Sequence, residues 1–313
     1  MLSFLKKYSN KNILIIGGSG FIGTNLAKKL IQLDSKVSLF QRVKIQHDPV
    51  FSYYYGDITN NSKLKKIVKQ NFDIIFHCAG FSGEINNQNN PEKSIQINYL
   101  ATRDLLDFIH QYSPTTKTVI CSSRLEYGKS TTKNVNENHP TRPIGFYGIS
   151  KLLSTVYTSH MHQKHNLPVT ILRISNVYGS SSPFKFEHYN IINHFINQAK
   201  NKKNLIVYGK GNQIRDYLYI DDLINALLLA GISKKANGQI YNVGFGKGIR
   251  FKTMVKKIGA QAGVKVQYKS WPADYASVET GNYVSNIKKI KSHLNWQPKI
   301  SFDQGIKMCF LQE

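Results

Sequence analysis

Short apolar runs alternate with longer stretches of helical periodicity through the first half of the chain. Asn12–Ile16 is an apolar run of strand length, whereas Leu26, Leu30 and Leu33 recur on one face of a helix. Strands that alternate with helices predict βαβ units and a parallel sheet buried on both faces. The predicted strands are Asn12–Ile16, Lys36–Phe40, Ser52–Tyr55, Asp73–His77, Thr118–Ser122 and Val169–Ile174, and the predicted helices are Phe21–Leu33, Ser62–Lys69, Pro91–His110 and Phe146–His165.

The pattern changes after Tyr178, where the loop-forming run Gly179–Pro183 predicts a domain boundary. We expect an α/β fold with two parts, a doubly wound Rossmann domain and a smaller C-terminal α/β substrate-binding lobe. The Rossmann domain comprises residues 1–178 and a returning segment of about 213–246, and the lobe comprises 179–212 and 247–313. Elements predicted here are strands Leu205–Tyr208, Tyr217–Ile220 and Ile240–Val243, helices His188–Lys200, Asp221–Ala230 and Lys252–Ala262, and one or two helices in the tail.

Length and composition fit a globular protein. The chain has 313 residues, 41% of them hydrophobic, which is enough to bury a large core. No apolar run has the length of a membrane span, and the apolar part of Met1–Lys7 is too short for a signal peptide. These features predict a cytoplasmic protein without a membrane span. Cys78, Cys121 and Cys309 have no metal-ligand spacing, so we expect no metal site.

The net charge of +24 has three possible meanings: a nucleic-acid surface, attraction to an anionic membrane, or lysines on a solvated face. The lysines are scattered, arginine is scarce, and no stretch combines clustered cations with aromatic residues as a nucleic-acid groove would. The solvated face is therefore favoured, and we expect no nucleic-acid partner. A positive field would still attract an anionic substrate.

A glycine motif follows the first predicted strand. Gly17, Gly20 and Gly23 are spaced three apart and lead directly into a predicted helix. Glycines at this spacing permit a tight turn, close approach of a pyrophosphate to the backbone, and close packing of helix on strand. The helix N-terminus then presents free N–H groups to phosphate. The motif in this context predicts a dinucleotide site.

A tyrosine and a lysine form a second candidate constellation. Tyr147 and Lys151 are four residues apart and share one face of a predicted helix. A phenol titrates near about 10 in water, too high for acid/base work at neutral pH, but a neighbouring ammonium favours the phenolate. The spacing alone is common in helices, but together with the motifs described next it predicts that Tyr147 is a general acid/base whose pKa is lowered by Lys151.

Further motifs accompany this pair. Phe21 and Ile22 lie inside the glycine motif, the fifth strand ends in Ser122-Ser123-Arg124-Leu125-Glu126-Tyr127-Gly128, and Arg215-Asp216-Tyr217 follows later. Together the motifs resemble the extended short-chain dehydrogenase/reductase family, in its branch of NAD-dependent nucleotide-sugar epimerases and dehydratases. The resemblance covers nearly the whole chain. It implies an NAD(P)-dependent enzyme that acts on a nucleotide-diphosphate sugar.

The resemblance also implies residue roles. It makes Ser123 the catalytic serine that hydrogen-bonds the reacting oxygen, beside Tyr147 and Lys151. The residues that it places at the cofactor are Gly17, Gly20, Phe21, Ile22, Gly23, Gln41, Arg42, Asp57, Ile58, Ala79, Gly80, Asn98, Tyr147 and Lys151. Those at the substrate are Ser123, Arg124, Asn176 and Arg215, with Arg215 on the diphosphate. A helix-surface position for Asn98 stays open, and we interpret His77 as a packed histidine.

The residues at the end of the second predicted strand are compatible with two cofactors, NAD and NADP. A carboxylate there would bind the ribose hydroxyls of NAD, but the chain has Gln41-Arg42. Gln41 can hydrogen-bond a ribose, which suits NAD, the cofactor that we expect. Arg42 can accept a 2′-phosphate, which suits the alternative, NADP.

The reaction is narrowed by the two residues after Ser123. Dehydratases of the family usually carry Asp-Glu there, whereas this chain has Arg124 and Leu125, and Glu126 is one place too late. We therefore expect a 4-epimerase, which oxidises C4 of a nucleotide-linked hexose transiently and returns the hydride. An NADPH-dependent 4-keto-sugar reductase and, in another class, a non-catalytic NAD(P)-sensing protein are the alternatives. Tyr147, Lys151 and Ser123 together argue against the sensor.

Two further expectations come from the resemblance. Many relatives carry a second phosphate-binding arginine before their C-terminal helices, and residues 271–283 contain none. The long helices that begin at Pro91 and Phe146 form a dimer interface in many relatives, which implies a homodimer.

Overall fold

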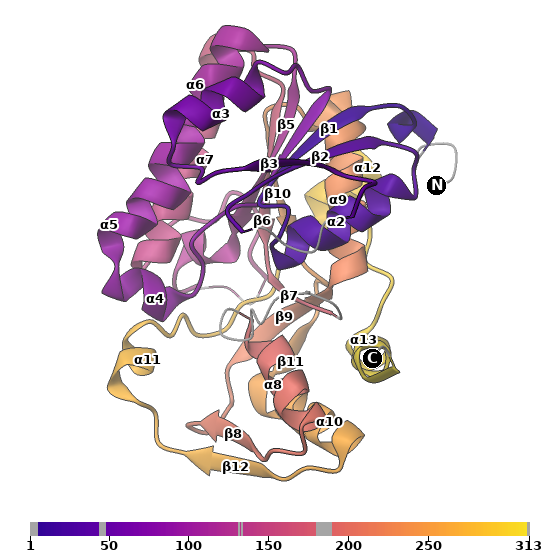
Figure 1. The fold of residues 1–313 in the computed structure, drawn as a ribbon. Helices are drawn as coiled ribbons and strands as arrows, with labels where there is room; N and C mark the ends of the chain where they lie inside the picture. Colours follow the sequence, from indigo (N-terminus) through magenta and orange to yellow (C-terminus); the bar gives the residue numbers. More distant parts are fainter. Residues whose placement is uncertain (1–5, 44–47, 131, 133, 180–189, 312–313) are drawn as a thin grey trace.

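The computed structural model of the chain describes residues 6–43, 48–130, 132, 134–179 and 190–311. Residues 180–183 of the predicted boundary loop, and the start of the predicted helix at His188, lie outside this part. The fold has a large upper part built on one sheet and a smaller lower part, and strands in the middle connect them (Figure 1).

A seven-stranded, wholly parallel sheet forms the centre of the upper part, in the order β10-β6-β5-β4-β1-β2-β3. Its strands are β1 (Asn12–Ile16), β2 (Lys36–Gln41), β3 (Ser52–Tyr55), β4 (Ile74–His77), β5 (Lys117–Ser123), β6 (Val169–Ile174) and β10 (Gln239–Val243). The order reverses between β1 and β4, and such a switch point opens a crevice at the carboxyl ends of the strands. The predicted doubly wound Rossmann fold is confirmed.

Helices cover both faces of this sheet (Figure 1). Helices α2 (Phe21–Ile31) and α9 (Ile220–Ile232) pack together on one face, and α3 (Asn61–Val68), α6 (Ala101–Tyr112) and α7 (Phe146–His165) on the other. Consecutive residues of β1 consequently face opposite cores: Ile13 packs in one and Leu14 in the other, and both are fully buried. This two-sided burial is why the strands read as continuous apolar runs.

The predicted helix Pro91–His110 differs from the structure. It divides into α5 (Pro91–Ser94), a π-helical turn η2 (Ile95–Leu100) and α6. Asn98 lies within the π turn and is buried at 1% exposure, so its amide meets partners inside the protein. A π turn shifts the helical register by one residue and is frequent at functional sites, and hydrophobic periodicity does not reveal it. The prediction of one regular helix was wrong in this respect.

The lower part contains two small sheets. Strands β7 (Asn176–Tyr178), β9 (Ile214–Tyr219) and β11 (Gly248–Arg250) form one, and β8 (Leu205–Tyr208) with β12 (Val266–Lys269) forms the other. The predicted strand Tyr217–Ile220 proves to be β9, which begins three residues earlier because the polar pair Arg215-Asp216 is buried within it. The remaining helices are α4 (Glu84–Asn89), α8 (Ile191–Lys200), α10 (Phe251–Ala262), α11 (Ala273–Ser277), α12 (Lys288–Leu294) and α13 (Phe302–Leu311).

Candidate active site

The glycine turn after β1 approaches β4 so closely that side chains are excluded. Gly17 has φ +89°, and a Cβ built on it would lie 2.6 Å from the backbone nitrogen of Ala79. A Cβ on Gly23 would overlap the carbonyl oxygen of Gly17. Helix and strand thus touch through backbone alone. The protein backbone itself fills the space that a Cβ would take, so glycine at these positions is what allows the turn after β1, the segment after β4 and α2 to pack this closely.

The first turn of α2 has the geometry that can hold a phosphate. Its N-cap is Gly20, whose backbone is extended, and no side chain caps the N–H groups within the described residues. The hydroxyl of Thr24 donates to Gly18 O at 3.0 Å and closes the turn behind them. The N–H groups at Phe21 and Ile22 are therefore left for an anion, as the fit of a dinucleotide pyrophosphate requires.

The end of β2 carries an orphaned acceptor. Gln41 is 3% exposed, its Nε2 donates to Val43 O at 3.1 Å, and its Oε1 is buried without a partner in the described residues. A ribose hydroxyl would satisfy that oxygen. The guanidinium of Arg42 is 62% exposed and lies 3.9 Å from the Asp57 carboxylate, so a neighbouring carboxylate already offsets its charge. Ile58 next to Asp57 is buried.

His77, at the end of β4, is a packed histidine, as predicted. Its ring is 2% exposed, and Nε2 lies 2.9 Å from the Thr102 hydroxyl. Burial and the nearby charge of Lys151 lower the pKa of His77 to about 3, so the ring is neutral at physiological pH.

Asn98 forms hydrogen bonds to the backbone of the loop after β4. Its Oδ1 accepts the Phe81 N–H at 2.8 Å, its Nδ2 donates to Phe81 O at 3.0 Å, and Nδ2 also lies 3.0 Å from the Ser150 hydroxyl. The side chain therefore fastens the segment Ala79–Gly80–Phe81 to α7. Neither a surface position nor a free amide is left for Asn98. A Cβ on Gly80 would lie 3.9 Å from Lys151 Nζ, so this loop borders the Lys151 ammonium.

The structure brings the predicted trio together where β5 ends and α7 begins. Ser123 and Lys151 are 8% and 6% exposed. The Tyr147 hydroxyl is hydrogen-bonded to Ser123, whose Oγ also accepts the Leu125 N–H at 3.1 Å. Lys151 Nζ donates to the carbonyl oxygen of Cys121 at 2.6 Å. A phenol, a hydroxyl and an ammonium thus converge on one edge of the sheet.

The predicted lowering of the Tyr147 pKa by Lys151 is not what the structure shows. Burial raises the pKa of Tyr147, the negative charge of Glu84 raises it further, and the Ser123 hydrogen bond lowers it. Burial in turn lowers the pKa of Lys151, whose ammonium is directed at the Cys121 carbonyl. The four-residue spacing correctly placed Tyr147 and Lys151 on one face of the helix, but it did not reveal the Glu84 carboxylate, which comes from α4.

Two arginines meet on the side of the smaller lobe. Arg124 Nη1 donates to the Thr280 hydroxyl at 3.1 Å, and its guanidinium lies 5.2 Å from the Tyr283 ring centre. Burial and the charge of Arg215 lower the pKa of Arg124 to about 10. Arg215 is ion-paired with Glu279 and donates to Gly281 O. Arg124 thus reaches the segment 271–283, in which the second arginine was expected.

Asn176 lies apart from the trio, on β7. Its Nδ2 donates to the carbonyl oxygen of Asp216 at 3.1 Å, and the side chain is half-buried. The Asp216 carboxylate accepts N–H groups from Phe245, Gly246 and Ser285, which ties the strands of the lobe together. Thr280, Tyr283 and Glu84 were not predicted, because they join the site only through folding and carry no local motif.

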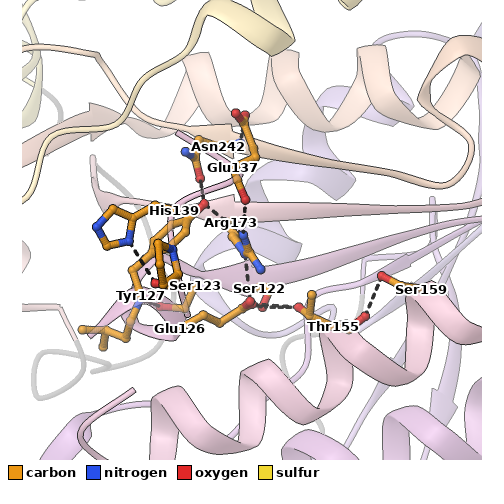
Figure 2. A network of polar contacts seen from close by, with 12 residues as sticks. Ser122, Ser123, Glu126, Tyr127, Glu137, His139, Thr155, Ser159, Arg173 and Asn242 are labelled. Carbon is orange, nitrogen blue, oxygen red and sulfur yellow. Dashed lines mark hydrogen bonds and ion pairs between the residues drawn. The ribbon is translucent and has the colours of Figure 1, made fainter. Parts of the chain in front are cut away.

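A second polar cluster lies behind the site (Figure 2). The Glu126 carboxylate, fully buried, is ion-paired with Arg173 at 2.8 Å and accepts hydrogen bonds from Ser122 and Thr155. The Tyr127 hydroxyl donates to Asn242 Oδ1 at 2.7 Å and accepts from Arg173. Every one of these groups is engaged, so neither Glu126 nor Tyr127 is available for chemistry.

Comparison with known proteins agrees with this geometry. The model of the NAD dependent epimerase/dehydratase family matches residues 13–244. The putative UDP-glucose 4-epimerase of Methanocaldococcus jannaschii is 30% identical over 94% of this chain and 96% of its own length. The structure of epimerase Mth375 from Methanothermobacter thermautotrophicus has a TM-score of 0.88 at 25% identity, covering 98% of this chain and 93% of that one.

A third relative carries a cofactor in its structure. The dTDP-glucose 4,6-dehydratase of Bacillus anthracis, solved in complex with NAD, has a TM-score of 0.83 at 25% identity, with 96% of both chains covered.

Within the described residues of this chain, no helix is both long and apolar enough to span a bilayer, and no cluster of side chains has the composition of a metal site.

Proposed function

This chain belongs to the NAD-dependent epimerase/dehydratase family, and on that premise we propose that it is a nucleotide-sugar 4-epimerase. The observation that carries the proposal is the hydrogen bond between Ser123 and Tyr147, with Lys151 fixed beside them at the cofactor loop. A pair of hydroxyl groups at this place is suited to exchanging a proton with one oxygen of a sugar.

NAD is the cofactor that the site fits. The turn Gly17–Gly23 and the first turn of α2 would hold the pyrophosphate, and the unpaired Gln41 Oε1 would accept a hydrogen bond from a ribose. Lys151, beside Gly80, would hold the nicotinamide end of the cofactor. When bound, NAD supplies the acceptor and donor of hydride. A 2′-phosphate would have to share Arg42 with Asp57, so the structure favours NAD over NADP.

Tyr147 is the residue that moves the proton. Its raised pKa keeps the phenol protonated at neutral pH, which suits return of a proton to the sugar oxygen. Removal of a proton requires the phenolate, which the Ser123 hydrogen bond and a nearby ammonium favour. Ser123 also holds the reacting oxygen in place and stabilises charge on it.

Elimination of water is disfavoured by the same segment. A 4,6-dehydration needs a further acid and base near the sugar, and the residues after Ser123 are Arg124 and Leu125. Glu126 is held in the Arg173 ion pair. Arg124 and Arg215 present two buried guanidinium groups that suit a sugar diphosphate.

Native mass spectrometry of the purified protein tests the proposal. An epimerase returns its hydride to the same sugar, so NAD should co-purify with the folded chain. Retention of NADPH, with oxidation of NADPH on addition of a 4-keto sugar nucleotide, would instead identify a reductase.

We also propose a homodimer through α6 and α7. Leu153 and Val156 of α7 are 38% and 59% exposed, which is unusual for large apolar side chains on one helix. Light scattering checks this, and a monomer would contradict it.

A further inference from the structure

Glu84 is a buried carboxylate that the proposed reaction does not use. It is the first residue of α4 and follows Gly83, whose φ is +89°. Both of its carboxylate oxygens are buried, and neither has a hydrogen-bond partner of normal geometry within the described residues. Burial without partners is costly for a carboxylate, and such groups in native proteins generally have a reason.

The carboxylate lies against the start of α7, next to the catalytic tyrosine. A Cβ built on Gly145 would overlap Glu84 Oε1, so only glycine there leaves room for this side chain. Burial raises the pKa of Glu84, whereas the backbone N–H of Tyr147 and the charge of Arg124 lower it. Glu84 therefore lies between the acid/base Tyr147 and the arginine that follows Ser123.

The loop that carries Glu84 is held rigidly. Asn87 Nδ2 donates to Phe81 O at 3.0 Å and to Gly83 O at 2.8 Å, and Asn98 fixes Phe81 from the π turn. Asn87 is itself fully buried. These bonds fix the backbone of the loop, so a rotation of the Glu84 side chain, and not a movement of the loop, would bring the carboxylate to a partner.

The charges around Glu84 define what it accepts. Lys151, Arg124 and Arg215 already place three cations in the site, so a further cationic group on the ligand would be repelled. A carboxylate is an acceptor only, and neutral O–H groups satisfy it without adding charge. Hydroxyl groups of a sugar ring have this chemistry, and the ring must lie between the Tyr147 hydroxyl and the diphosphate-binding arginines.

We propose that Glu84 is a specificity-determining residue whose carboxylate accepts hydrogen bonds from hydroxyl groups of the substrate's sugar ring. The proposal rests on the proposed function, because it takes a nucleotide sugar as the ligand. It assigns to α4 a substrate contact that neither the glycine motif nor the catalytic trio supplies.

The same contact links substrate binding to the tyrosine. The charged groups that face the Tyr147 phenol are Glu84 from α4, Cys121 from β5 and Glu126 from η3 (Arg124–Tyr127), with Lys151 one turn along α7. Cys121 and Glu126 are engaged by protein partners. Glu84 is the one that a sugar would neutralise in part, so binding of the sugar lowers the cost of forming the phenolate.

Calorimetric titration with UDP-glucose and with UDP tests the contact, because UDP has no sugar. Glu84→Ala should weaken UDP-glucose about ten- to hundredfold, the usual worth of hydrogen bonds to a charged group, and leave UDP unchanged. Glu84→Gln keeps one acceptor oxygen and should lose less. Glu92→Gln, an exposed glutamate of α5, is the matched control for charge.

The outcomes separate this proposal from the function. Equal weakening of UDP and UDP-glucose, or no weakening of either, would overturn the role of Glu84 while leaving a nucleotide-sugar site. A wild-type protein that binds neither ligand would overturn the proposed function, and the Glu84 contact with it. If Glu84→Ala does not fold, Glu84→Gln gives the same comparison.

A pH profile adds a readout that a purely structural role would not move. The acid limb of kcat/KM reports the free enzyme and that of kcat the complex. In the wild type, the kcat limb should lie at lower pH than the kcat/KM limb, and in Glu84→Gln the two should coincide. An unchanged separation in the variant would contradict the proposal.

Discussion

The polar cluster around Glu126 and the polar cluster around Tyr147 adjoin the same strand end, yet they differ in how completely their hydrogen bonds are made. Glu126 is ion-paired with Arg173 and accepts hydrogen bonds from two hydroxyl groups (Figure 2). Glu84, beside Tyr147, is half-buried as a residue, and within the described part of the chain its two buried oxygens have no hydrogen-bond partner of normal geometry. We interpret this as a division of roles, in which the Glu126 carboxylate stabilises the fold and the Glu84 carboxylate is left to accept hydrogen bonds from a ligand.

Replacing one tyrosine from each cluster should give the largest contrast. Tyr147→Phe should lower turnover about 10²–10⁴-fold, the usual loss for a general acid/base, with little change in unfolding free energy. Tyr127→Phe removes a hydroxyl between Asn242 and Arg173, and should cost about 1–3 kcal/mol of stability while the folded enzyme still turns over. Steady-state kinetics and denaturant unfolding measure both. Normal turnover in Tyr147→Phe would contradict the mechanism.

Breaking the buried ion pair should give a large effect on stability alone. Arg173→Met leaves the Glu126 charge buried without its partner and should cost about 3–5 kcal/mol of unfolding free energy. Binding of NAD to the folded fraction should persist, because the glycine turn lies on β1 and α2. Denaturant unfolding with and without NAD measures this. A variant as stable as the wild type would show that the cluster does not hold the fold.

The buried His77 should make the unfolding free energy of the protein depend on pH. Its folded pKa, about 3, lies below the unfolded value, so its stabilising contribution is complete above about pH 6.5 and is lost as the pH falls toward 3. The loss between pH 7 and pH 5 should be about 2 kcal/mol. His77→Gln should lose this dependence, and His160→Gln, an exposed histidine, should keep it. Equal pH dependence in both variants would exclude His77 as the cause.

Arg42→Ala should give the smallest effect. The guanidinium is exposed and paired with Asp57, so NAD affinity should change less than about fivefold. NADP affinity should fall more, because a 2′-phosphate loses its cation. Equal changes for both cofactors, measured by fluorescence titration, would remove Arg42 as a reader of the 2′-phosphate.

The sequence predicted the parts of the site that depend on local geometry. The spacing of Gly17, Gly20 and Gly23 follows from one tight turn, and the spacing of Tyr147 and Lys151 from one helical turn, so both were visible in the chain. Ser123 and Arg215 were visible through motifs that resemble a family. The alternation of strands and helices likewise predicted the parallel sheet.

The parts that the sequence hid depend on contacts between distant segments. Glu84 begins a short helix of polar residues without apolar periodicity, and its meeting with Gly145 arises only when α4 packs on α7. The π turn at Asn98 interrupts a pattern that remains helical in its hydrophobic spacing. Arg124 contacts Thr280, which lies 156 residues further along the chain. Because the contact between Glu84 and the start of α7 was hidden in the sequence, the direction of the Tyr147 pKa shift was predicted wrongly.

The central claim is that Ser123, Tyr147 and Lys151 interconvert the two configurations at C4 of a nucleotide-linked sugar. Proton NMR of UDP-glucose incubated with the purified protein, without added cofactor, tests it most directly. We expect signals of the C4 epimer to appear and to reach a constant ratio with those of UDP-glucose. Formation of a 4-keto-6-deoxy sugar, or a spectrum that stays that of UDP-glucose while NAD is bound, would contradict it.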